Sequence, residues 1–412
     1  MKNDFLQEMQ DRGFLNQCTD LGKLEEICNK KSISGYIGFD CTASSLHVGS
    51  LLQIMILKLM QKYGHRPIVL LGGGTTLIGD PSGKDSTRKI LEQSEIKNNI
   101  KSIKKVFNKI LDTSNKNTSP VFVDNADWLT KLNYFQFLRD IGSHFTINKM
   151  LTFDSVKLRL DREQSLSYME FNYMILQAYD FYQLFKNNNC ILQIGGSDQW
   201  GNIVNGVDLI RRKLQKESYG LTSPLITLAS GAKMGKTEKG AIWLNEDKLS
   251  SYGYWQFWRN TDDRDVKRFL NFFTEIQPKE LNKIISKEKN INKLKVLLAS
   301  EATKILHGEV ASKKAEKTAK DTFEGEGLSS GLPEITIKFN EVEHGVNILD
   351  FISKNKILSS KSEARRVIAN KGFKIDGAII ENEKKVIQLK DFKNNVLKLS
   401  YGKKKHYLVK II

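Results

Sequence analysis

The sequence contains only four cysteines, and they are scattered along the chain. Cys18, Cys28, Cys41 and Cys190 form no C-x-x-C pair, the spacing typical of structural zinc sites and redox motifs. Four isolated thiols in 412 residues also do not indicate a disulfide framework. We therefore expect reduced and mostly buried thiols, which behave as small apolar side chains, and no protein-held metal at these positions.

Long apolar runs are missing as well. A membrane-spanning helix needs about 18 consecutive apolar residues, and the strongest candidate, around residues 51–60, is interrupted by Gln53 and Lys58. The first residues, MKNDFLQEMQDRG, are amphipathic and carry acidic groups, unlike a secretory signal or a transit peptide. These features predict a cytoplasmic protein without a membrane partner.

Two common nucleotide-binding fingerprints are incomplete. Residues 79–84 and 231–237 each fall one residue short of the phosphate loop G-x-x-x-x-G-K-[ST]. The run Gly72–Gly74 lacks the third glycine of the dinucleotide fingerprint. The sequence thus excludes a P-loop nucleotide hydrolase and makes an NAD-dependent enzyme a poor hypothesis.

Basic residues are in excess, and the excess is uneven. The formal net charge is +17, and residues 341–412 contribute 16 Lys and Arg against 8 Asp and Glu. A basic segment fits a polyanionic partner such as RNA, although a solvated lysine-rich surface has the same composition. The C-terminal region is therefore the better candidate for an RNA surface.

Strand and helix patterns alternate in the first half of the chain. Apolar runs at 36–39, 65–74 and 120–129 read as strands, and residues 51–63 and 167–186 have helical periodicity. This alternation predicts a Rossmann-like parallel sheet whose ligand site lies at the carboxyl ends of the strands. A chain of this length is expected to hold two or three domains.

The stretch YIGFDCTASSLHVGS at residues 36–50 is the first candidate site. His47 and Gly49 fall where the first strand gives way to a helix, and a helix N-terminus attracts phosphate through its free N–H groups. Gly49 leaves room for a nucleotide, and His47 offers a hydrogen-bond donor. A plainly capped buried helix gives the same pattern, so a second motif is needed.

That second motif is KMGKT at residues 233–237. Together with GFDCTASSLHVGS, GDPSGK and QIGGSDQWGNI it makes the chain resemble the class I aminoacyl-tRNA synthetases, and among them the bacterial-type tyrosyl-tRNA synthetases, from about residue 8 to the C-terminus. The resemblance implies an enzyme that activates tyrosine with ATP to tyrosyl-adenylate and then transfers tyrosyl to the 3′-terminal ribose of tRNA(Tyr).

In this reaction the amino acid's own carboxylate attacks the α-phosphate of ATP, so no catalytic base is required. The enzyme must position the reactants and stabilise charge on the phosphates, which calls for cationic side chains and backbone donors. The resemblance implies these catalytic residues: Thr42, His47, Lys84, Arg88, Lys233 and Lys236. It implies that ATP is bound by Asp40, His47, Gly49, Ser50, Gly196, Asp198 and Lys236.

The same resemblance implies the tyrosine pocket. Tyr36 and Asp180 match the residues that meet the substrate hydroxyl, whereas Tyr173, Gln177 and Asp80 match the ammonium cluster. A further residue, Gln199, is expected near the substrate carboxylate. Positions 173, 177 and 180 share one helix face, although any amphipathic helix places residues in this way.

The expected domains are a Rossmann-like catalytic domain (1–225), a loop region with the lysine motif (226–246), an α-helical tRNA-anticodon domain (247–322), a linker (323–340) and a small α/β RNA-binding domain (341–412). This last domain resembles the ribosomal-protein S-four type. It would contact RNA through Lys361, Ser362, Arg365, Arg366 and Lys371. Magnesium is expected to arrive with ATP, without a protein-held metal, and a homodimer is implied because residues 133–151 lie near a dimer interface in the family.

Two positions depart from the family pattern: Ser50 replaces the second His of the HIGH signature, and Cys41 replaces a Pro. We expect a retained but altered contact with ATP. Two other functions remain possible, a tryptophanyl-tRNA synthetase and an RNA-binding protein built on an inactive synthetase. The phenol-matching Asp180 and the C-terminal RNA domain disfavour the first, and the intact lysines disfavour the second.

Overall fold

The computed structural model describes residues 4–80, 91–232, 234–237, 240–324, 332–355, 357–402 and 405–412. Within these ranges the side chains of residues 154, 155, 236, 237, 240 and 322–324 are not described. The chain forms two compact units. The N-terminal unit comprises residues 1–249 and 257–307, and the C-terminal unit comprises residues 250–256 and 308–412.

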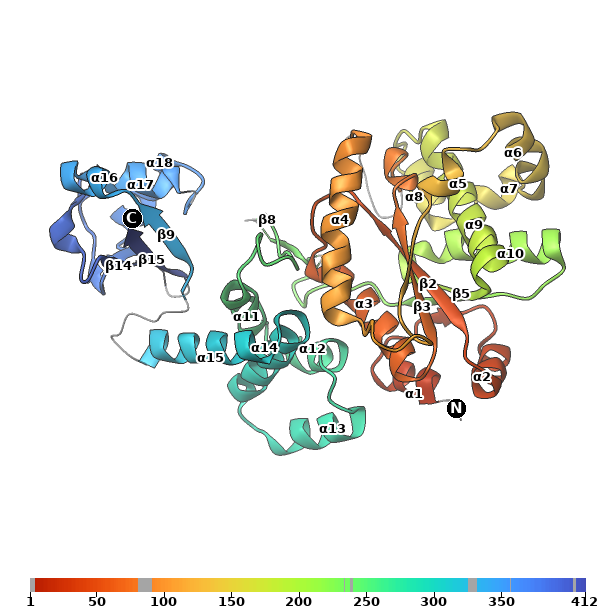
Figure 1. The fold of residues 1–412 in the computed structure, drawn as a ribbon, viewed down its shortest axis with the longest axis horizontal. Coiled ribbons are helices and arrows are strands. Elements are labelled where there is room, and N and C mark those ends of the chain that lie inside the picture. Colours follow the sequence, from red (N-terminus) through yellow and green to blue (C-terminus); the bar gives the residue numbers. More distant parts are fainter. Residues whose placement is uncertain are drawn as a thin grey trace. The chain divides into compact units, whose positions relative to one another are not determined.

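A six-stranded sheet forms the centre of the N-terminal unit, with the strand order β1-β6-β5-β2-β3-β4 (Figure 1). Its strands are β1 (Gln17–Cys18), β2 (Ser34–Asp40), β3 (Arg66–Gly72), β4 (Val121–Asp124), β5 (Cys190–Gly196) and β6 (Tyr219–Ser223). Strands β2 to β6 are parallel, and β1 pairs with β6 in the antiparallel sense. The expected Rossmann-like parallel sheet is confirmed.

The order of the strands reverses between β2 and β5. The chain runs from β2 outward through β3 to β4, and then returns to place β5 on the other side of β2. Crossover connections leave a crevice at the carboxyl ends of the strands at such a reversal, and ligands of open α/β sheets bind there. Asp40 and Gly196 end these two neighbouring strands.

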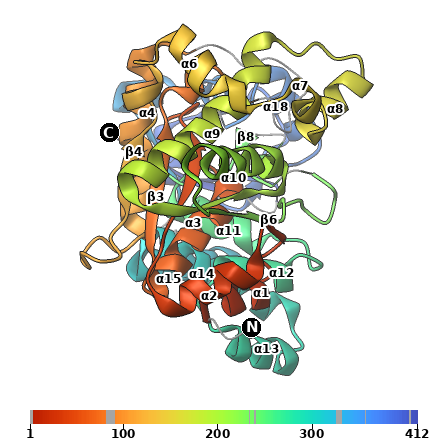
Figure 2. The same ribbon diagram turned by 90° about the vertical axis from the view of Figure 1, so that its right-hand side faces the viewer.

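Helices cover both faces of this sheet (Figures 1 and 2). Side chains of β2 alternate between the faces: Phe39 packs on Phe107 of α4 (Gln93–Ile110), and Tyr36 packs on Phe181 of α9 (Tyr168–Asn188). Helix α3 (Val48–Lys62) contacts β3 and α4, whereas α10 (Trp200–Leu214) contacts α9, β5 and β6. The sheet core is therefore buried on both sides.

Local signals fix the ends of the long helix α9. Ser167 and Glu170 form a capping box at its start, because each side chain accepts a hydrogen bond from the backbone of the other residue. At the other end Asn189 adopts a left-handed conformation with φ of 50°, which Asn tolerates better than most residues. The helix thus presents a defined face over 21 residues.

Shorter elements complete the N-terminal unit. Before α10 they are α1 (Asp4–Asp11), α2 (Leu21–Lys30), η1 (Thr75–Leu77), α5 (Ala126–Leu129), α6 (Tyr134–Asp140), η2 (Gly142–His144), α7 (Ile147–Met150), α8 (Asp154–Asp161) and η3 (Ser197–Gln199). After it come the hairpin β7 (Lys236–Thr237) and β8 (Gly240–Ala241), then α12 (Val266–Phe273), α13 (Pro278–Lys287) and α14 (Ile291–His307). Helix α11 (Ser251–Arg259) spans the boundary of the two units.

The helices expected to form a separate domain at 247–322 do not form one compact body. Helix α12 packs on α3, and α14 packs on α4 and α12, so these helices belong to the N-terminal unit. Helix α15 (Glu309–Glu324) is grouped with the C-terminal unit instead. The amphipathic pattern identified helices correctly, but it carries no information on which body each apolar face covers.

The C-terminal unit has its own core and a five-stranded sheet of order β12-β11-β14-β15-β9. Its elements are β9 (Glu334–Ile337), α16 (Phe339–His344), β10 (Val346–Asn347), α17 (Ile348–Lys354), α18 (Lys361–Ala369), β11 (Phe373–Ile375), β12 (Ala378–Ile379), β13 (Val386–Ile387), η4 (Leu389–Asp391), β14 (Val396–Tyr401) and β15 (Lys405–Ile411). Strand β9 pairs with β15, Ile335 opposite Val409. The sheet therefore begins within residues 323–340, which were expected to be a linker.

Candidate active site

One face of β2 forms the floor of the candidate site. Tyr36, Gly38 and Asp40 alternate with core residues and therefore point to the same side as α9. Gly38 is exposed although it belongs to an inner strand, and among the described residues a Cβ placed on it would meet only Leu70 within 4 Å. The sheet surface is thus open beside Gly38, where a bound molecule can lie directly on the backbone.

Helix α9 supplies the opposite wall. Its Tyr173, Gln177 and Asp180 lie on one face, as the spacing predicted, and the Tyr173 hydroxyl donates to Asp40 Oδ1 at 3.5 Å. Tyr173 and Asp180 are buried. The structure therefore places Tyr173, Gln177 and Asp180 on the helix face that lies opposite Tyr36 and Asp40 of β2.

A chain of side-chain amides continues this wall onto α10. Asn202 Nδ2 donates to Gln177 Oε1 at 3.0 Å and to Gln199 Oε1 at 3.1 Å. Gln199 Nε2 in turn donates to Asp80 Oδ2 at 3.0 Å. Three predicted residues are thus linked through Asn202, which the sequence analysis did not single out. Its signal was present, because it lies three residues after Gln199 and so shares one helix face with it.

The carboxylate of Asp180 belongs to a residue that is only 1% exposed. It accepts a hydrogen bond from Asn125 Nδ2 at 2.9 Å and another from Trp128 Nε1 at 2.7 Å. Burial raises the pKa of Asp180 to about 7, although both hydrogen bonds oppose the shift by favouring the charged form. The phenol of Tyr36 is also buried, and its hydroxyl has no hydrogen-bond partner among the described residues.

Asn125 and Trp128 are functional candidates that sequence reasoning missed. Asn125 Oδ1 also accepts from the backbone N–H of Gly74 at 2.8 Å, so this side chain ties the turn after β3 to the carboxylate on α9. A polar residue directly after strand β4 was the available signal, because the strand ends at the ligand edge of the sheet. Its partner on α9 lies 55 residues away, which no local pattern reveals.

His47 caps the helix that starts beside β2. Its Nδ1 accepts the backbone N–H of Gly49 at 3.0 Å, so the neutral ring carries its proton on Nε2. That N–H is a hydrogen-bond donor at the N-terminus of α3, where the helix dipole also favours a negative group. Ser50 lies in the same first turn, and its N–H donates to the His47 carbonyl at 2.8 Å.

The two sequence motifs lie side by side. The backbone N–H of Val48 donates to Ile242 at 2.9 Å, and that of Leu244 donates to Leu46 at 2.9 Å. A Cβ placed on Gly235 would lie 3.0 Å from the Gly49 nitrogen and 2.7 Å from His47 Nδ1. The backbones of the two segments are therefore in direct contact, which only glycine at both positions permits.

Gly196 and Asp198 lie at the carboxyl end of β5, on the opposite side of β2 from β3. A Cβ on Gly196 would approach Asp198 Oδ1 to 2.6 Å, so Gly196 leaves room for the Asp198 carboxylate beside the end of β5. Asp40 ends β2 and Asp198 follows β5, so both residues lie at the reversal point. This arrangement fits a hydroxyl-rich group such as a ribose.

Several predicted residues are not placed by the structure. Lys84, Arg88 and Lys233 fall outside the described residues, and only the backbone of Lys236 is described, in β7. Thr42 is exposed on the loop after β2. Among the described residues no group of three or more His, Cys, Asp or Glu is arranged to hold a metal ion.

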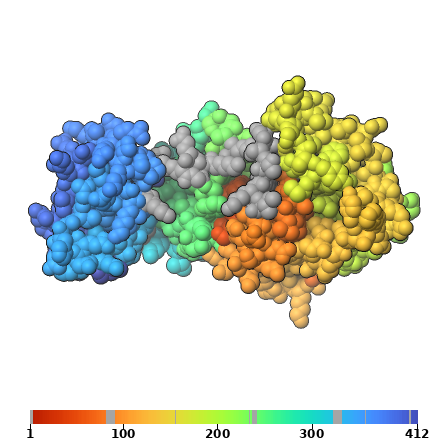
Figure 3. Space-filling view, turned by 90° about the horizontal axis from the view of Figure 1, so that it is seen from above, coloured from red at the N-terminus to blue at the C-terminus, as the bar shows by residue number. Residues whose placement is uncertain are grey.

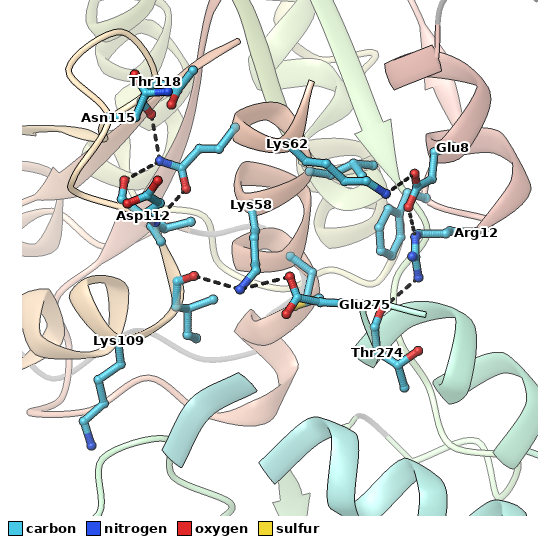
Figure 4. A pocket seen from close by; sticks show the side chains of 16 residues that line it. Glu8, Arg12, Lys58, Lys62, Lys109, Asp112, Asn115, Thr118, Thr274 and Glu275 are labelled. Atoms are coloured by element: carbon cyan, nitrogen blue, oxygen red, sulfur yellow. Dashed lines mark hydrogen bonds and ion pairs between the residues drawn. The ribbon is translucent and has the colours of Figure 1, made fainter. Parts of the chain in front are cut away.

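A separate cavity of about 510 Å³ lies around the other end of α3 (Figure 4). Its charged side chains are paired within the protein: Lys58 Nζ lies 3.1 Å from Glu275, and Glu8 contacts both Arg12 at 2.7 Å and Lys62 at 2.5 Å. These contacts connect α1, α3 and the turn after α12. The cavity is thus crossed by structural ion pairs, and we assign no ligand to it.

In the C-terminal unit the predicted RNA-contacting residues lie on or directly after α18, and all are exposed. Three of them have acidic neighbours: Lys361 pairs with Asp350, Arg365 with Glu383 at 3.6 Å, and Lys371 with Glu381 at 2.9 Å. Exposed pairs of this kind contribute little to stability. The cations therefore remain available to compete for phosphate groups.

Apolar side chains are exposed on α6 to α9 of the N-terminal unit. They are Tyr134, Phe135, Leu138, Ile147, Leu151, Leu158, Leu160 and Tyr168. Phe135 is 81% exposed, and the Tyr134 and Tyr168 hydroxyls lie 3.2 Å apart. Helices α6, α7 and α8 lie at one end of this unit (Figure 2), and part of the region is seen in yellow in Figure 3. We call this set the α6–α9 patch. Apolar patches of this kind mark interaction surfaces.

Across the described part of the chain, no helix combines the length and apolarity needed to traverse a bilayer.

Two family models match the chain. The model for tRNA synthetases class I (W and Y) matches residues 28–324, and a tyrosine–tRNA ligase SYY-like C-terminal domain matches residues 324–409. Curated relatives include the tyrosine–tRNA ligase of Pelagibacter ubique, which is 60% identical over 410 residues and covers 100% of both chains. That of Rickettsia prowazekii is 52% identical over 409 residues and covers 99% of this chain and 100% of its own.

Solved structures agree with the fold. A C-terminally truncated mitochondrial tyrosyl-tRNA synthetase of Aspergillus nidulans is 29% identical with a TM-score of 0.70, covering 78% of this chain and 95% of its own. The tryptophanyl-tRNA synthetase of Plasmodium falciparum is 14% identical with a TM-score of 0.54, covering 76% and 84%. The fold is therefore shared by tyrosine and tryptophan enzymes, whereas the relatives of high identity are tyrosine–tRNA ligases.

Proposed function

Because the chain belongs to the class I tRNA synthetases (W and Y) and is a tyrosine–tRNA ligase, we propose that its tyrosine site is the space between β2 and α9. ATP would meet the paired motifs at 46–50 and 233–237. The ligase consumes tyrosine and ATP, forms tyrosyl-adenylate and pyrophosphate, and charges tRNA. Magnesium enters with ATP.

The assignment of the tyrosine pocket rests on one observation. The hydroxyl of Tyr36 is buried close to the Asp180 carboxylate and has no hydrogen-bond partner among the described residues. A buried hydroxyl without a partner is costly, and a substrate hydroxyl placed between Tyr36 and Asp180 removes that cost. Phenylalanine has no hydroxyl and would leave both groups without this partner. The pocket floor therefore selects a phenol.

At the other end of the pocket the substrate ammonium would meet oxygen acceptors. Tyr173, Gln177 and Asp80 supply them, and the hydrogen-bonded chain through Asn202 holds two of the three in place. The same chain positions Gln199 for the substrate carboxylate. We assign Asn202 the role of orienting these two glutamine side chains, since it donates to both.

For ATP, the N-terminus of α3 and the glycine contacts support the assignment. His47 Nε2 is a donor for phosphate oxygens at the N-terminus of α3, where the helix dipole also favours a negative group, and Gly49 lets the chain approach closely. Gly196, Asp198 and Asp40 would hold the ribose. Lys236 belongs to the hairpin whose Gly235 contacts the His47 segment, and we propose that Lys236 and Lys233 bind the phosphates, together with Lys84 and Arg88.

These groups account for activation without a general base. The tyrosine carboxylate attacks the α-phosphorus, the bond to the bridging oxygen breaks, and pyrophosphate departs with the electron pair. Oriented donors that face the growing negative charge stabilise this transition state. Holding both reactants in one cleft removes much of the entropic cost of their encounter.

We also propose a homodimer, which the α6–α9 patch supports. Tyr134, Phe135 and Tyr168 are large side chains that are more than half exposed, and covering them with a second copy removes apolar surface from water. We place the enzyme in the cytoplasm, where tRNA is charged. The exposed cations of α18 would contact the phosphates of tRNA(Tyr).

The direct test is tyrosine-dependent exchange of pyrophosphate into ATP, measured in parallel with tryptophan. We expect exchange with tyrosine and a far lower rate with tryptophan, because an indole offers no hydroxyl to Tyr36 and Asp180. Exchange that is equal with both amino acids would contradict the pocket assignment. RNA binding without any exchange would instead favour an inactive synthetase that only binds RNA.

A further inference from the structure

A buried asparagine joins the two motif segments at a point that neither motif includes. Asn245 directly follows Leu244, whose N–H is bonded to Leu46, and Asn245 is 7% exposed. Its backbone N–H donates to Ser45 Oγ at 3.0 Å, and its Oδ1 accepts from the same hydroxyl at 2.8 Å. Two hydrogen bonds therefore connect Asn245 with one serine, 200 residues earlier in the chain.

The other half of the Asn245 amide reaches a third segment. Its Nδ2 donates to Ser102 Oγ at 3.0 Å and to the Ser102 carbonyl at 3.3 Å, on α4. One turn earlier Asn99 Nδ2 donates to the carbonyl of Cys41 at 2.9 Å. Helix α4 thus holds both ends of the loop 41–45, at Cys41 directly and at Ser45 through Asn245.

This cluster fixes one end of the lysine hairpin. Ile242, three residues before Asn245, donates its N–H to the Gly235 carbonyl at 3.1 Å. The segment 242–244 therefore connects two features. It directly follows the hairpin of β7 and β8, and it pairs with residues 46–48. The pairing of residues 242–244 with residues 46–48 is short, since it rests on the backbone hydrogen bonds from Val48 to Ile242 and from Leu244 to Leu46. The buried Asn245 adds side-chain hydrogen bonds at the end of this pairing.

We propose that Asn245 is a positioning residue for tyrosine activation, which sets the placement of the hairpin bearing Lys236 against the His47 segment through Ser45 and Ser102. It does not touch substrate, since its polar atoms are buried against other protein groups. This inference rests on the proposed contact of Lys236 with ATP. Loosening the cluster displaces the phosphate-binding groups and leaves the tyrosine pocket between β2 and α9 intact.

The experiment measures tyrosine-dependent exchange in the full-length variants Asn245→Ala and Ser45→Ala, together with tyrosine affinity at equilibrium. We expect kcat/KM for ATP to fall about tenfold in each, which corresponds to about 1.4 kcal/mol of transition-state stabilisation. The Kd for tyrosine should stay within about twofold of the wild-type value, an expectation from the separation of the two sites. The double variant should lose less than the sum of the two single losses, because both changes remove the hydrogen bond between Ser45 Oγ and Asn245 Oδ1.

Two further variants separate positioning from general loosening of the core. Asn245→Asp keeps the acceptor for the Ser45 hydroxyl but puts an oxygen where Nδ2 donates to the Ser102 hydroxyl and carbonyl, so its kcat/KM for ATP should fall at least as far as that of Asn245→Ala if the contact with α4 positions the hairpin. Thr274→Val removes a buried hydroxyl that donates to the Leu270 carbonyl at 2.8 Å. It should lower the melting temperature and leave kcat/KM for ATP unchanged.

An unchanged kcat/KM for ATP in folded Asn245→Ala or Ser45→Ala would overturn the proposal, and so would an equal loss of tyrosine affinity. If Asn245→Ala does not fold, the Ser45→Ala result decides. Lys236→Ala is measured alongside. If Lys236→Ala leaves exchange intact, the assignment of Lys236 to ATP is wrong. If Lys236→Ala loses exchange activity and Asn245→Ala does not, only the inference on Asn245 is rejected.

Discussion

The backbone of Gly235 lies against that of Gly49, so closely that a Cβ on Gly235 would sit 3.0 Å from the Gly49 nitrogen. Gly235 also has φ of +88°, a conformation that other residues adopt at a cost. Two motifs nearly 200 residues apart in the sequence therefore meet through their glycines. Any side chain here would push the lysine hairpin away from the N-terminus of α3.

The variant Gly235→Ala should consequently lose ATP-dependent activation and keep tyrosine binding. We expect kcat/KM for ATP in the exchange assay to fall at least about tenfold, from steric strain and the positive φ together. Gly231 also has a positive φ of 82°, but no atom of the described residues lies within 4 Å of a Cβ placed there. Gly231→Ala is thus the matched control. An equal loss of kcat/KM for ATP in Gly235→Ala and Gly231→Ala would mean that backbone strain alone, and not the contact with Gly49, causes the loss.

Replacement of Tyr36 by Phe should weaken tyrosine binding, because the substrate hydroxyl loses one partner. A single neutral hydrogen bond contributes roughly 0.5–1.5 kcal/mol, so the Kd for tyrosine should rise roughly two- to twelvefold. Tyr219→Phe is a suitable control, since that hydroxyl donates to Glu217 at 3.2 Å, away from the site. Equal affinities in wild type and Tyr36→Phe would remove Tyr36 from the pocket.

Tyrosine affinity should depend on pH near neutrality. The pKa of Asp180 is raised to about 7 by burial, and the carboxylate is the form that accepts the substrate hydroxyl. Protonation therefore grows as the pH falls from 8 to 6, and the Kd for tyrosine should rise over this range by up to about tenfold. Isothermal titration at several pH values measures this. In Asp180→Asn the dependence should vanish, and its persistence there would assign it to another group.

The variant Trp128→Phe extends this test to the environment of the carboxylate. Removal of the indole N–H takes away a hydrogen bond that favours the charged form, so the pKa of Asp180 should rise further. The pH profile of tyrosine affinity should move to higher pH, so the loss of affinity relative to wild type should be smallest above pH 8 and should grow as the pH falls below 7. A uniform loss at all pH values would point instead to weaker packing.

Stability should follow the same linkage. The folded-state pKa of Asp180 lies above the unfolded value of about 3.8, so the folded protein binds more protons between these two pKa values. The contribution of this group to stability is largest below pH 4 and is lost as the pH rises to about 7. Relative to wild type, Asp180→Asn should therefore gain stability toward pH 8, as melting temperatures can show.

The variant Phe135→Asp should dissociate the proposed dimer. Phe135 is 81% exposed within the α6–α9 patch, and a charge placed in a buried apolar interface is strongly unfavourable. Sedimentation equilibrium should give the mass of a dimer for wild type and of a monomer for the variant. Val310, which is 82% exposed on α15, provides the control Val310→Asp, which should stay dimeric. If sedimentation equilibrium gives the mass of a monomer for the wild type, the proposed dimer is wrong.

The double variant Arg365→Ala and Arg366→Ala should weaken charging of tRNA and leave tyrosine activation unchanged. Removing cations that pair with phosphates also reduces the dependence of tRNA affinity on salt, with a slope smaller by about one for each ion pair removed. Lys384 and Lys390 are exposed in the same unit, and their joint replacement by Ala tests whether net charge alone matters. Equal losses in both double variants would reject a specific role for α18.

Local patterns in the sequence were sufficient for much of the fold and for part of the site. The parallel sheet followed from alternating strand and helix patterns, and the positions of Tyr173, Gln177 and Asp180 on one helix face followed from their spacing. In contrast, β9 was expected to be linker. A strand of four residues is stabilised mainly by its partner, here β15, and that partner lies about 70 residues further along the chain.

The sequence by itself determined the family, because the resemblance lies in short motifs of local residue order, and that resemblance implied the chemistry. Only the tertiary structure decided which groups meet: Asn125 and Trp128 on the Asp180 carboxylate, Asn202 between two glutamines, Asn245 between Ser45 and Ser102. These contacts join residues far apart in the chain, and hydrogen bonds between them form only when the packed sheet and helices bring their donors and acceptors within about 3 Å. The conformational propensities of neighbouring residues carry no information on that distance.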